Sequence, residues 1–408
     1  MEHMSVPQFL GVLVVILGAA KLGGALAKAV GQPSVLGELL AGVFLGASVL
    51  GLVDSKLEVI HLLSELGVVI LLFAIGLETD LKKLLKVGGA SAAVAVAGVV
   101  LPFAMGYGVC RAMGLANLAA IMVGAALTAT SVGITARVLS DLGRLQEPES
   151  QVVLGAAVLD DIVGLVILTV VVGLTQGQEV TLGGVVMTTG VAFGFLIATL
   201  ALGSFVVPPL FRLAGRIDLP GTATILAVML AFGLAWLADR SGSALIIGAF
   251  AAGILLARTP QAHEVEHGVT VLGHFFVPIF FVAVGAAVDV RVFNPLDPAN
   301  QRALMLGGLL IAAAVASKFA AGYAAFWFPG KKSVIGAGMI PRGEVGLIFA
   351  QMGLASGVLD AGLFGAVTLM VMATTFVAPP LLKSLLAPPR PENAEEESEG
   401  IKNLVNIT

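Results

Sequence analysis

Apolar segments follow one another along almost the whole chain, and this pattern limits the folds that are open to it. Of the 408 residues, 58% are hydrophobic and only 12% are charged. About 20 apolar residues in a helix cross a hydrocarbon core of about 30 Å, where backbone groups must pair within the segment. We therefore predict an all-α polytopic membrane protein with about thirteen transmembrane helices. The expected limits are 7–29, 33–52, 59–78, 87–111, 117–140, 150–174, 182–211, 220–239, 242–257, 264–288, 302–327, 333–356 and 361–386.

The last residues of the chain differ in composition from the rest. The stretch PPRPENAEEESEG, from Pro388 to Gly400, is polar, acidic and contains proline. A segment of low hydrophobicity and high charge does not bury enough apolar surface to fold. We predict a transmembrane domain over residues 1–386 and a disordered, acidic cytoplasmic tail over residues 387–408.

The composition also excludes several kinds of site. The single cysteine, Cys110, excludes a disulfide within the chain and a cysteine metal cluster. The sequence has no basic block that would indicate nucleic-acid binding and no Gly-rich loop that would indicate a nucleotide site. We therefore expect the lipid bilayer as a partner, but no nucleic acid and no cofactor.

Lysine and arginine are distributed unevenly between the two sets of predicted loops and flanks. The richer set carries Lys28, Lys82, Lys83, Lys86, Arg144, Arg212, Arg216, Arg258, Lys331, Lys332 and Lys383. The poorer set carries Lys56, Arg111, Arg240, Arg291 and Arg302. Cytoplasmic loops of membrane proteins carry the excess of these residues. We therefore expect the N-terminus outside and the C-terminus in the cytoplasm.

Three segments of the first half resemble three segments of the second half, in the same order. The pairs are GELLAGVFL (37–45) with GAFAAGILL (248–256), FAIGLETDL (73–81) with VAVGAAVDV (282–290), and GAALTATSVGIT (124–135) with GAGMIPRGEVGL (336–347). The partners lie an odd number of predicted helices apart, so the two halves have opposite orientations. Inverted repeats of this kind are typical of transporters whose binding site lies at mid-membrane.

The third pair of segments predicts two broken helices that cross. Thr128–Thr135 (TATSVGIT) places four hydroxyls and a glycine in one span, and Met339–Gly346 (MIPRGEVG) places Pro341 in another. Proline removes a backbone donor and glycine loosens a helix, and helix ends carry partial charges of about ±0.5. Arg342 and Glu344 are placed to neutralise such ends. The alternative is that both segments are packing kinks.

Two adjacent aspartates, Asp160 and Asp161, lie within the apolar run Gly155–Leu174. One carboxylate at mid-membrane costs about 2.5–3.5 kcal/mol on insertion scales. Successive helical residues point about 100° apart, so the two side chains have different surroundings. A buried aspartate is able to hold either a proton or a small hard cation such as Na⁺, and this competition is the basis of antiport. The alternative is that both carboxylates only bridge to neighbouring helices.

A single lysine, Lys318, lies in the middle of the predicted span that contains Leu310–Trp327. A lysine at that depth needs a carboxylate to support its charge. We expect it to pair with Asp160 or Asp161. The alternative is a lysine beside a water-filled funnel.

Four motifs together resemble the monovalent cation/proton antiporter-2 family, in particular its bacterial Na⁺/H⁺ antiporters. They are TATSVGITARVLSDLG, LGAAVLDDIVGL, SKFAAG and MIPRGEVGLI, and the resemblance covers nearly all of the chain except the acidic tail. It implies a homodimer of thirteen-helix protomers in a bacterial-type inner membrane. In each protomer a six-helix core moves against a dimerisation domain in an elevator-like step.

The resemblance also implies roles for individual residues. Asp161 would bind Na⁺ and the exchanged proton, and Asp160 would pair with Lys318. The first crossing break would contain Thr130 and Ser131, and these would complete the Na⁺ site with the two aspartates. The second break would contain Arg342 and Glu344. An aspartate pair with a lysine resembles the electrogenic members of the family.

We therefore expect a secondary active Na⁺(Li⁺)/H⁺ antiporter that serves pH homeostasis, and not an enzyme. One alternative is a K⁺/H⁺ antiporter of the same fold. A second is an organic-anion symporter with crossed helices, which would not need the buried lysine. A third is a membrane channel or sensor.

Overall fold

The computed structural model describes residues 5–55, 57–79, 81–175, 182–214, 221–294 and 298–386. The predicted acidic tail from residue 387 lies outside these ranges. The described residues form α1 (Val6–Ala29), α2 (Ser34–Leu45), α3 (Glu58–Glu78), α4 (Leu81–Lys86), α5 (Gly88–Ala112), α6 (Asn117–Thr128), α7 (Val132–Asp141), α8 (Pro148–Thr175), α9 (Leu182–Ala214), α10 (Thr222–Arg240), α11 (Leu245–Leu256), α12 (Ala262–Ala286), the 3₁₀ helix η1 (Val290–Phe293), α13 (Pro298–Ala321), α14 (Lys332–Gly338), α15 (Glu344–Ala355) and α16 (Ala361–Leu385).

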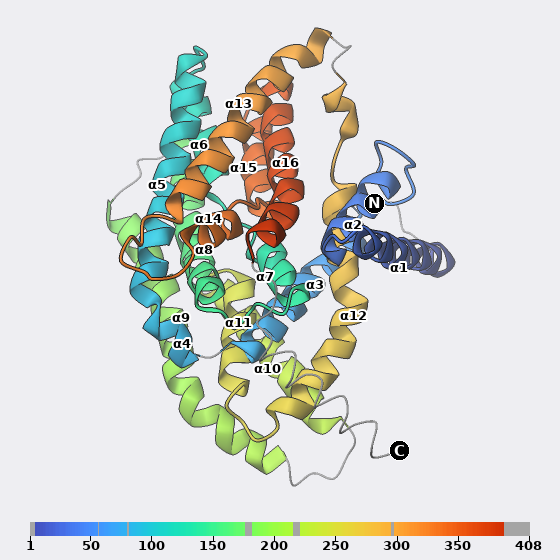
Figure 1. Cartoon of the computed structure of the whole chain (residues 1–408), viewed down its shortest axis with the longest axis vertical. Coiled ribbons are helices and arrows are strands. Elements are labelled where there is room, and N and C mark those ends of the chain that lie inside the picture. Colours follow the sequence, from blue (N-terminus) through green and yellow to red (C-terminus); the bar gives the residue numbers. More distant parts are fainter. Residues whose placement is uncertain are drawn as a thin grey trace.

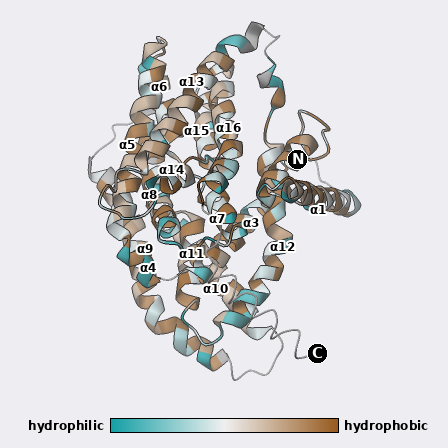
Figure 2. Ribbon diagram, viewed as in Figure 1, coloured by the Kyte–Doolittle hydropathy of each residue, from teal (hydrophilic) through white to brown (hydrophobic). Residues whose placement is uncertain are grey.

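These helices have the length and hydropathy of a polytopic membrane protein. In the described ranges ten are long and apolar enough to cross a membrane, with the interrupted stretch Asn117–Asp141 taken as one, and three further apolar helices are shorter. Figure 2 shows hydrophobic residues along the helices and many of the hydrophilic ones near their ends. Large apolar side chains such as Val14, Phe205 and Phe326 are more than two-thirds exposed, at 72%, 79% and 77%. Such surfaces fit lipid rather than water.

Two predicted spans end earlier than their apolar sequences suggest. The span expected over 33–52 stops at Leu45, and the next residue, Gly46, has an extended backbone (φ −63°, ψ 166°) where it packs on α12: a Cβ there would lie 2.7 Å from the Ala286 oxygen. The span expected over 302–327 stops at Ala321, where Gly322 packs against the backbone of α14. Hydropathy alone therefore overestimates helix length where a chain turns inside an apolar environment.

The helices form two bundles. The first bundle consists of α1, α2, α3, α10, α11 and α12, which pack mainly on one another. The second bundle consists of α5 to α8 and α13 to α16. Helix α4 packs on α5 and α8, whereas α9 contacts both α8 and α11. In Figure 1 the helices α5, α13, α15 and α16 occupy the upper part of the molecule, and α10 to α12 the lower part.

The predicted repeat reappears as a pair of equivalent contacts. Gly42 and Gly253 hold equivalent positions in the first pair of similar segments, and Gly76 and Gly285 in the second. A Cβ on Gly42 would lie 2.9 Å from the Cα of Gly285, and a Cβ on Gly253 would lie 2.7 Å from the carbonyl carbon of Gly76. The contact of α2 with α12 is thus repeated by α11 with α3, and in both only glycine allows the backbones so close.

Candidate functional site

Two interruptions in the helices of the second bundle contact each other. Helix α6 ends at Thr128 and α7 begins at Val132, while α14 ends at Gly338 and α15 begins at Glu344. The backbone N–H of Ser131 donates to the Pro341 oxygen at 2.9 Å, and the Thr135 hydroxyl donates to the Gly338 oxygen at 2.6 Å. Both interruptions lie within the two segments for which the sequence predicts them.

Arg342 connects the second interruption to α6 and α13 through hydrogen bonds. Its side chain is 0% exposed, and its Nε donates to the Leu127 oxygen at 3.1 Å in the last turn of α6. Its Nη2 donates to the Ala314 oxygen of α13 at 3.4 Å, and its Nη1 donates to the Ile340 oxygen. The last carbonyls of a helix have no partners within it and carry partial negative charge, so the guanidinium neutralises this end of α6. The Glu344 side chain lies outside the described residues.

Asp160, Lys318 and Thr130 form a buried polar network beside the first interruption. The Lys318 Nζ lies 3.0 Å from Asp160 Oδ2 and donates to the Thr130 hydroxyl oxygen at 2.6 Å. The Thr130 hydroxyl in turn donates to the same Asp160 oxygen. Lys318 is 0% exposed, Asp160 is 2% and Thr130 is 5%. The pairing of Asp160 with Lys318, expected from the resemblance, is therefore present in the structure.

Asp161 differs from Asp160 in its surroundings. It is partly exposed, whereas Asp160 is buried. The Asp160 Oδ1 atom is also buried, and it accepts no hydrogen bond from the part of the chain that the structure describes. The two adjacent residues therefore differ in exposure, as the 100° separation on a helix predicts, although one carboxylate oxygen of Asp161, Oδ2, is buried as well.

Packing against α5 and α8 buries Lys318. It lies in the last turn of α13, contrary to the prediction from the apolar sequence, because α13 ends at Ala321. A Cβ added to Gly98 on α5 would lie 3.3 Å from the Lys318 Nζ, so the absence of a side chain there makes room for the ammonium group. The sequence does not single out Gly98, because nothing local distinguishes it from other glycines in α5.

A second polar cluster joins the two bundles, and sequence analysis did not identify it either. The Arg137 Nε on α7 lies 3.1 Å from Asp141 Oδ1, and its Nη2 lies 3.8 Å from Glu38 Oε1 on α2. The Ser34 hydroxyl on α2 donates to Asp141 Oδ2 at 2.5 Å. Charges at helix ends in a sequence do not reveal which bundle they face.

Residues 13–387 match the transmembrane sodium/hydrogen exchanger family. The chain belongs to this family. The prediction of an antiporter family from four short motifs is thereby confirmed, and so is the broader prediction of a multi-pass membrane transporter. The two relatives compared next align over nearly the whole chain.

Two relatives and one solved structure illustrate the likeness. This chain is 41% identical to the high-affinity Na⁺/H⁺ antiporter NhaS3 of Synechocystis sp., over 94% of this chain and 91% of the relative. It is 37% identical to the Na⁺/H⁺-K⁺ antiporter GerN of Bacillus cereus, over 92% and 96%. The sodium proton antiporter MjNhaP1 of Methanocaldococcus jannaschii has a similar fold, with a TM-score of 0.69 at 16% identity over 93% of this chain and 97% of that chain.

Proposed function

We propose that the protein is a secondary active antiporter that exchanges cytoplasmic Na⁺, or Li⁺, for external protons. One observation carries this proposal: a buried ion pair between Lys318 and Asp160 lies beside a helix interruption, and the next residue, the partly exposed Asp161, carries a second carboxylate. Buried charges inside a membrane domain mark ion and proton pathways. The names of the two relatives support Na⁺ and protons as the exchanged ions.

Asp161 is the proposed ligand for the transported ion. A carboxylate is a hard oxygen ligand suited to a small cation, and the non-helical backbone of residues 129–131 and the Ser131 hydroxyl supply further oxygen atoms. Asp160 and Thr130 lie beside this site and bind Lys318. Protons and Na⁺ compete for Asp161, so the apparent affinity for Na⁺ falls as the pH is lowered.

Lys318 makes the exchange electrogenic in this proposal. When the ion enters, the Asp160–Lys318 pair separates and a proton is released from the lysine. When protons return, the pair forms again. One Na⁺ is then exchanged for two protons, and net charge moves across the membrane.

The arrangement of helices supports an elevator-like mechanism. The second bundle, with its six helices when each interrupted one is taken as a unit, carries the site and moves against the first bundle. Together with the ten longer helices, the three shorter apolar helices give thirteen membrane crossings, arranged in two inverted repeats. We further propose a homodimer that forms through the first bundle, in a bacterial-type inner membrane, with the N-terminus outside.

The second candidate is exchange of K⁺ for protons, which is favoured by the similarity to a relative named as a Na⁺/H⁺-K⁺ antiporter. Ion-substitution measurements separate the two candidates.

Reversal potentials of the full-length protein in proteoliposomes test the proposal. Under a Na⁺ gradient the potential should match two protons per Na⁺, and K⁺ should support little current. Asp161→Asn should abolish exchange without lowering thermal stability, because the amide binds neither proton nor cation strongly. Asp239→Asn, an exposed residue in the last turn of α10, is the control. Full exchange by the Asp161→Asn variant would contradict the ion-site assignment.

A further inference from the structure

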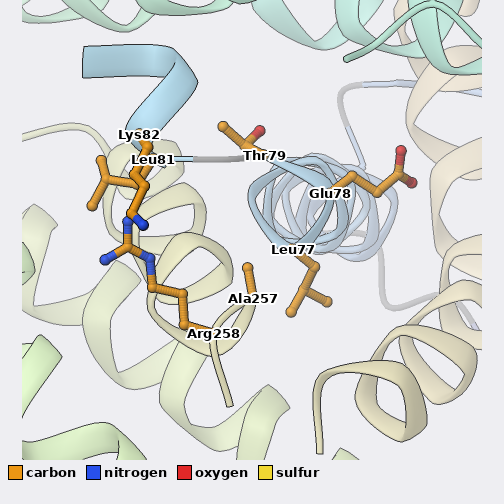
Figure 3. A pocket seen from close by; sticks show the side chains of 7 residues that line it. All are labelled: Leu77, Glu78, Thr79, Leu81, Lys82, Ala257 and Arg258. Atoms are coloured by element: carbon orange, nitrogen blue, oxygen red, sulfur yellow. The ribbon is translucent and has the colours of Figure 1, made fainter. Parts of the chain in front are cut away.

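The buried threonines of the described residues fall into two groups. In the larger group the hydroxyl donates to a carbonyl three or four residues earlier, which is the usual partner of a threonine in an apolar helix. Its five members are Thr79, Thr128, Thr259, Thr368 and Thr374. Thr79 is seen at the end of α3 in Figure 3. The other three, Thr130, Thr135 and Thr375, bond to a different element, and all three do so at the interrupted helices.

Thr135 and Thr375 hold the two ends of the second interruption. The Thr135 hydroxyl on α7 donates to the Gly338 oxygen at 2.6 Å, and the Thr375 hydroxyl on α16 donates to the Arg342 oxygen at 2.5 Å. Both threonines are 1% exposed. Within the described residues no backbone N–H donates to either oxygen, because α14 ends at Gly338 and Arg342 precedes α15. The two hydroxyls therefore supply the partners that an unbroken helix would have supplied.

Every carbonyl between these two also has a donor. The Arg342 Nη1 donates to the Ile340 oxygen and, at 3.5 Å, to the Met339 oxygen. The Ser131 N–H donates to the Pro341 oxygen at 2.9 Å. A buried carbonyl without a donor is costly, so this set of bonds fixes one conformation of the second interruption. Loss of either hydroxyl would leave one end of it unheld.

The second interruption is joined to the buried ion pair through the first. The bond from the Ser131 N–H to Pro341 links the two interruptions. The neighbouring residue, Thr130, accepts a hydrogen bond from the Lys318 Nζ at 2.6 Å and donates to Asp160. A shift of the second interruption therefore moves the residues that hold the ion pair.

We propose that the hydroxyls of Thr135 and Thr375 position the second interruption, and so keep the ion site ordered before the ion arrives. They are positioning residues, because they act through the backbone of other residues. A site that is ordered for only a fraction of the time binds its ligand more weakly by that fraction. Positioning stands independently of transport, whereas the effect on Na⁺ affinity rests on the proposed function.

Hydrogen–deuterium exchange of the full-length protein in detergent, without Na⁺, tests the positioning. Thr135→Val and Thr375→Val keep the side-chain shape and remove the hydroxyl. Peptides that contain residues 129–131 and 339–343 should exchange about fivefold faster, as the loss of one hydrogen bond implies. Thr374→Val is the matched control, because this equally buried neighbour bonds only to carbonyls of its own helix. Thr375→Ser keeps the hydroxyl and should restore the slow exchange.

The dependence of transport on Na⁺ concentration tests the effect on the ion site. In proteoliposomes Thr135→Val and Thr375→Val should raise the apparent KM for Na⁺ about fivefold and change the maximal rate less. General damage to the fold would instead lower the maximal rate, since fewer molecules would be active. Thr374→Val and Thr375→Ser should keep the KM of the unaltered protein.

The outcomes separate the proposal from the proposed function. Deuterium exchange in Thr135→Val and Thr375→Val equal to that in Thr374→Val would overturn the proposal, and so would faster deuterium exchange with an unchanged KM. Faster deuterium exchange in a protein that does not transport Na⁺ at all would support the positioning and contradict the proposed function. If Thr375→Val does not fold, Thr375→Ala and Thr375→Ser decide: only the alanine variant should show the faster deuterium exchange.

Discussion

At the scale of single residues, the Asp160–Lys318 pair shows why a membrane protein carries charges in its interior. Each charge alone would be costly at that depth, and the partner at 3.0 Å with the Thr130 hydroxyl offsets the cost. The three residues lie far apart in the sequence, and helix geometry alone does not choose between Asp160 and Asp161 as the partner of the lysine, although the family resemblance implies Asp160. In the structure the rotation of α8 within the bundle makes that choice.

Removing one member of this pair should destabilise the protein more than removing both. Lys318→Gln leaves Asp160 buried without its counter-charge, and breaking a buried pair in this way costs about 3–5 kcal/mol. The double variant Asp160→Asn with Lys318→Gln should recover most of the loss. Thermal melting in detergent measures both, with Lys86→Gln as the control. A double variant less stable than Lys318→Gln would contradict the pairing.

Gly98 should be sensitive to the smallest possible side chain. In Gly98→Ala the new methyl group lies 3.3 Å from the Lys318 Nζ and 3.5 Å from the Met339 methyl group, so the ammonium must shift. We expect slower exchange with an altered apparent affinity for Na⁺, measured in proteoliposomes. Gly108→Ala is the control on the same helix, since no atom lies within 4 Å of its added carbon. Equal activity of the two variants would remove Gly98 from the site.

At the scale of elements, the two interrupted helices are the feature that the sequence predicts best. Proline and glycine at 341 and 343 weaken a helix whatever surrounds it, and a run of hydroxyls has the same tendency at 128–131. The predicted ends of α2 and α13 were wrong for the opposite reason. Their sequences favour a longer helix, whereas in the structure α2 ends before Gly46, which packs on α12, and α13 ends before Gly322, which packs on α14.

A methyl group at Gly343 should push the two interruptions apart. Its Cβ would lie 2.8 Å from the Ser131 Oγ, while the backbone φ of −137° suits any residue, so the effect is steric only. Overpacking of this kind costs about 1–3 kcal/mol, and exchange should fall with it. Gly308→Ala, with no atom within 4 Å, is the control. The second change Ser131→Gly should restore thermal stability, and failure to do so would argue against this contact.

At the scale of the whole molecule, the polar cluster of Ser34, Glu38, Arg137 and Asp141 joins the two bundles. If the bundles move against each other during exchange, these contacts must separate in each cycle. The cluster therefore stabilises the arrangement seen here relative to others.

Arg137→Gln should lower the melting temperature of the protein and raise its maximal exchange rate. The substitution removes the ion pairs of Arg137 with Asp141 and Glu38 and leaves the buried Glu38 without this cation, so the melting temperature should fall. The barrier to bundle movement should fall as well, and the maximal exchange rate should rise. Rates in proteoliposomes and melting in detergent measure the two effects. Arg240→Gln, at the exposed end of α10, is the control. A lower melting temperature with a lower rate would contradict the link to movement.

The sequence by itself determined the membrane class, the two interruptions, the repeat and the residues that carry charge into the membrane. Each of these follows from local chemistry: apolar length, proline, glycine and an isolated charge act alike in any surroundings. The tertiary structure showed the contact of Lys318 with Asp160 that the resemblance only implied, and it alone decided that Gly98 makes room for the lysine and that α2 and α13 end early. These depend on the distances between helices far apart in the chain, which packing decides and local preference does not.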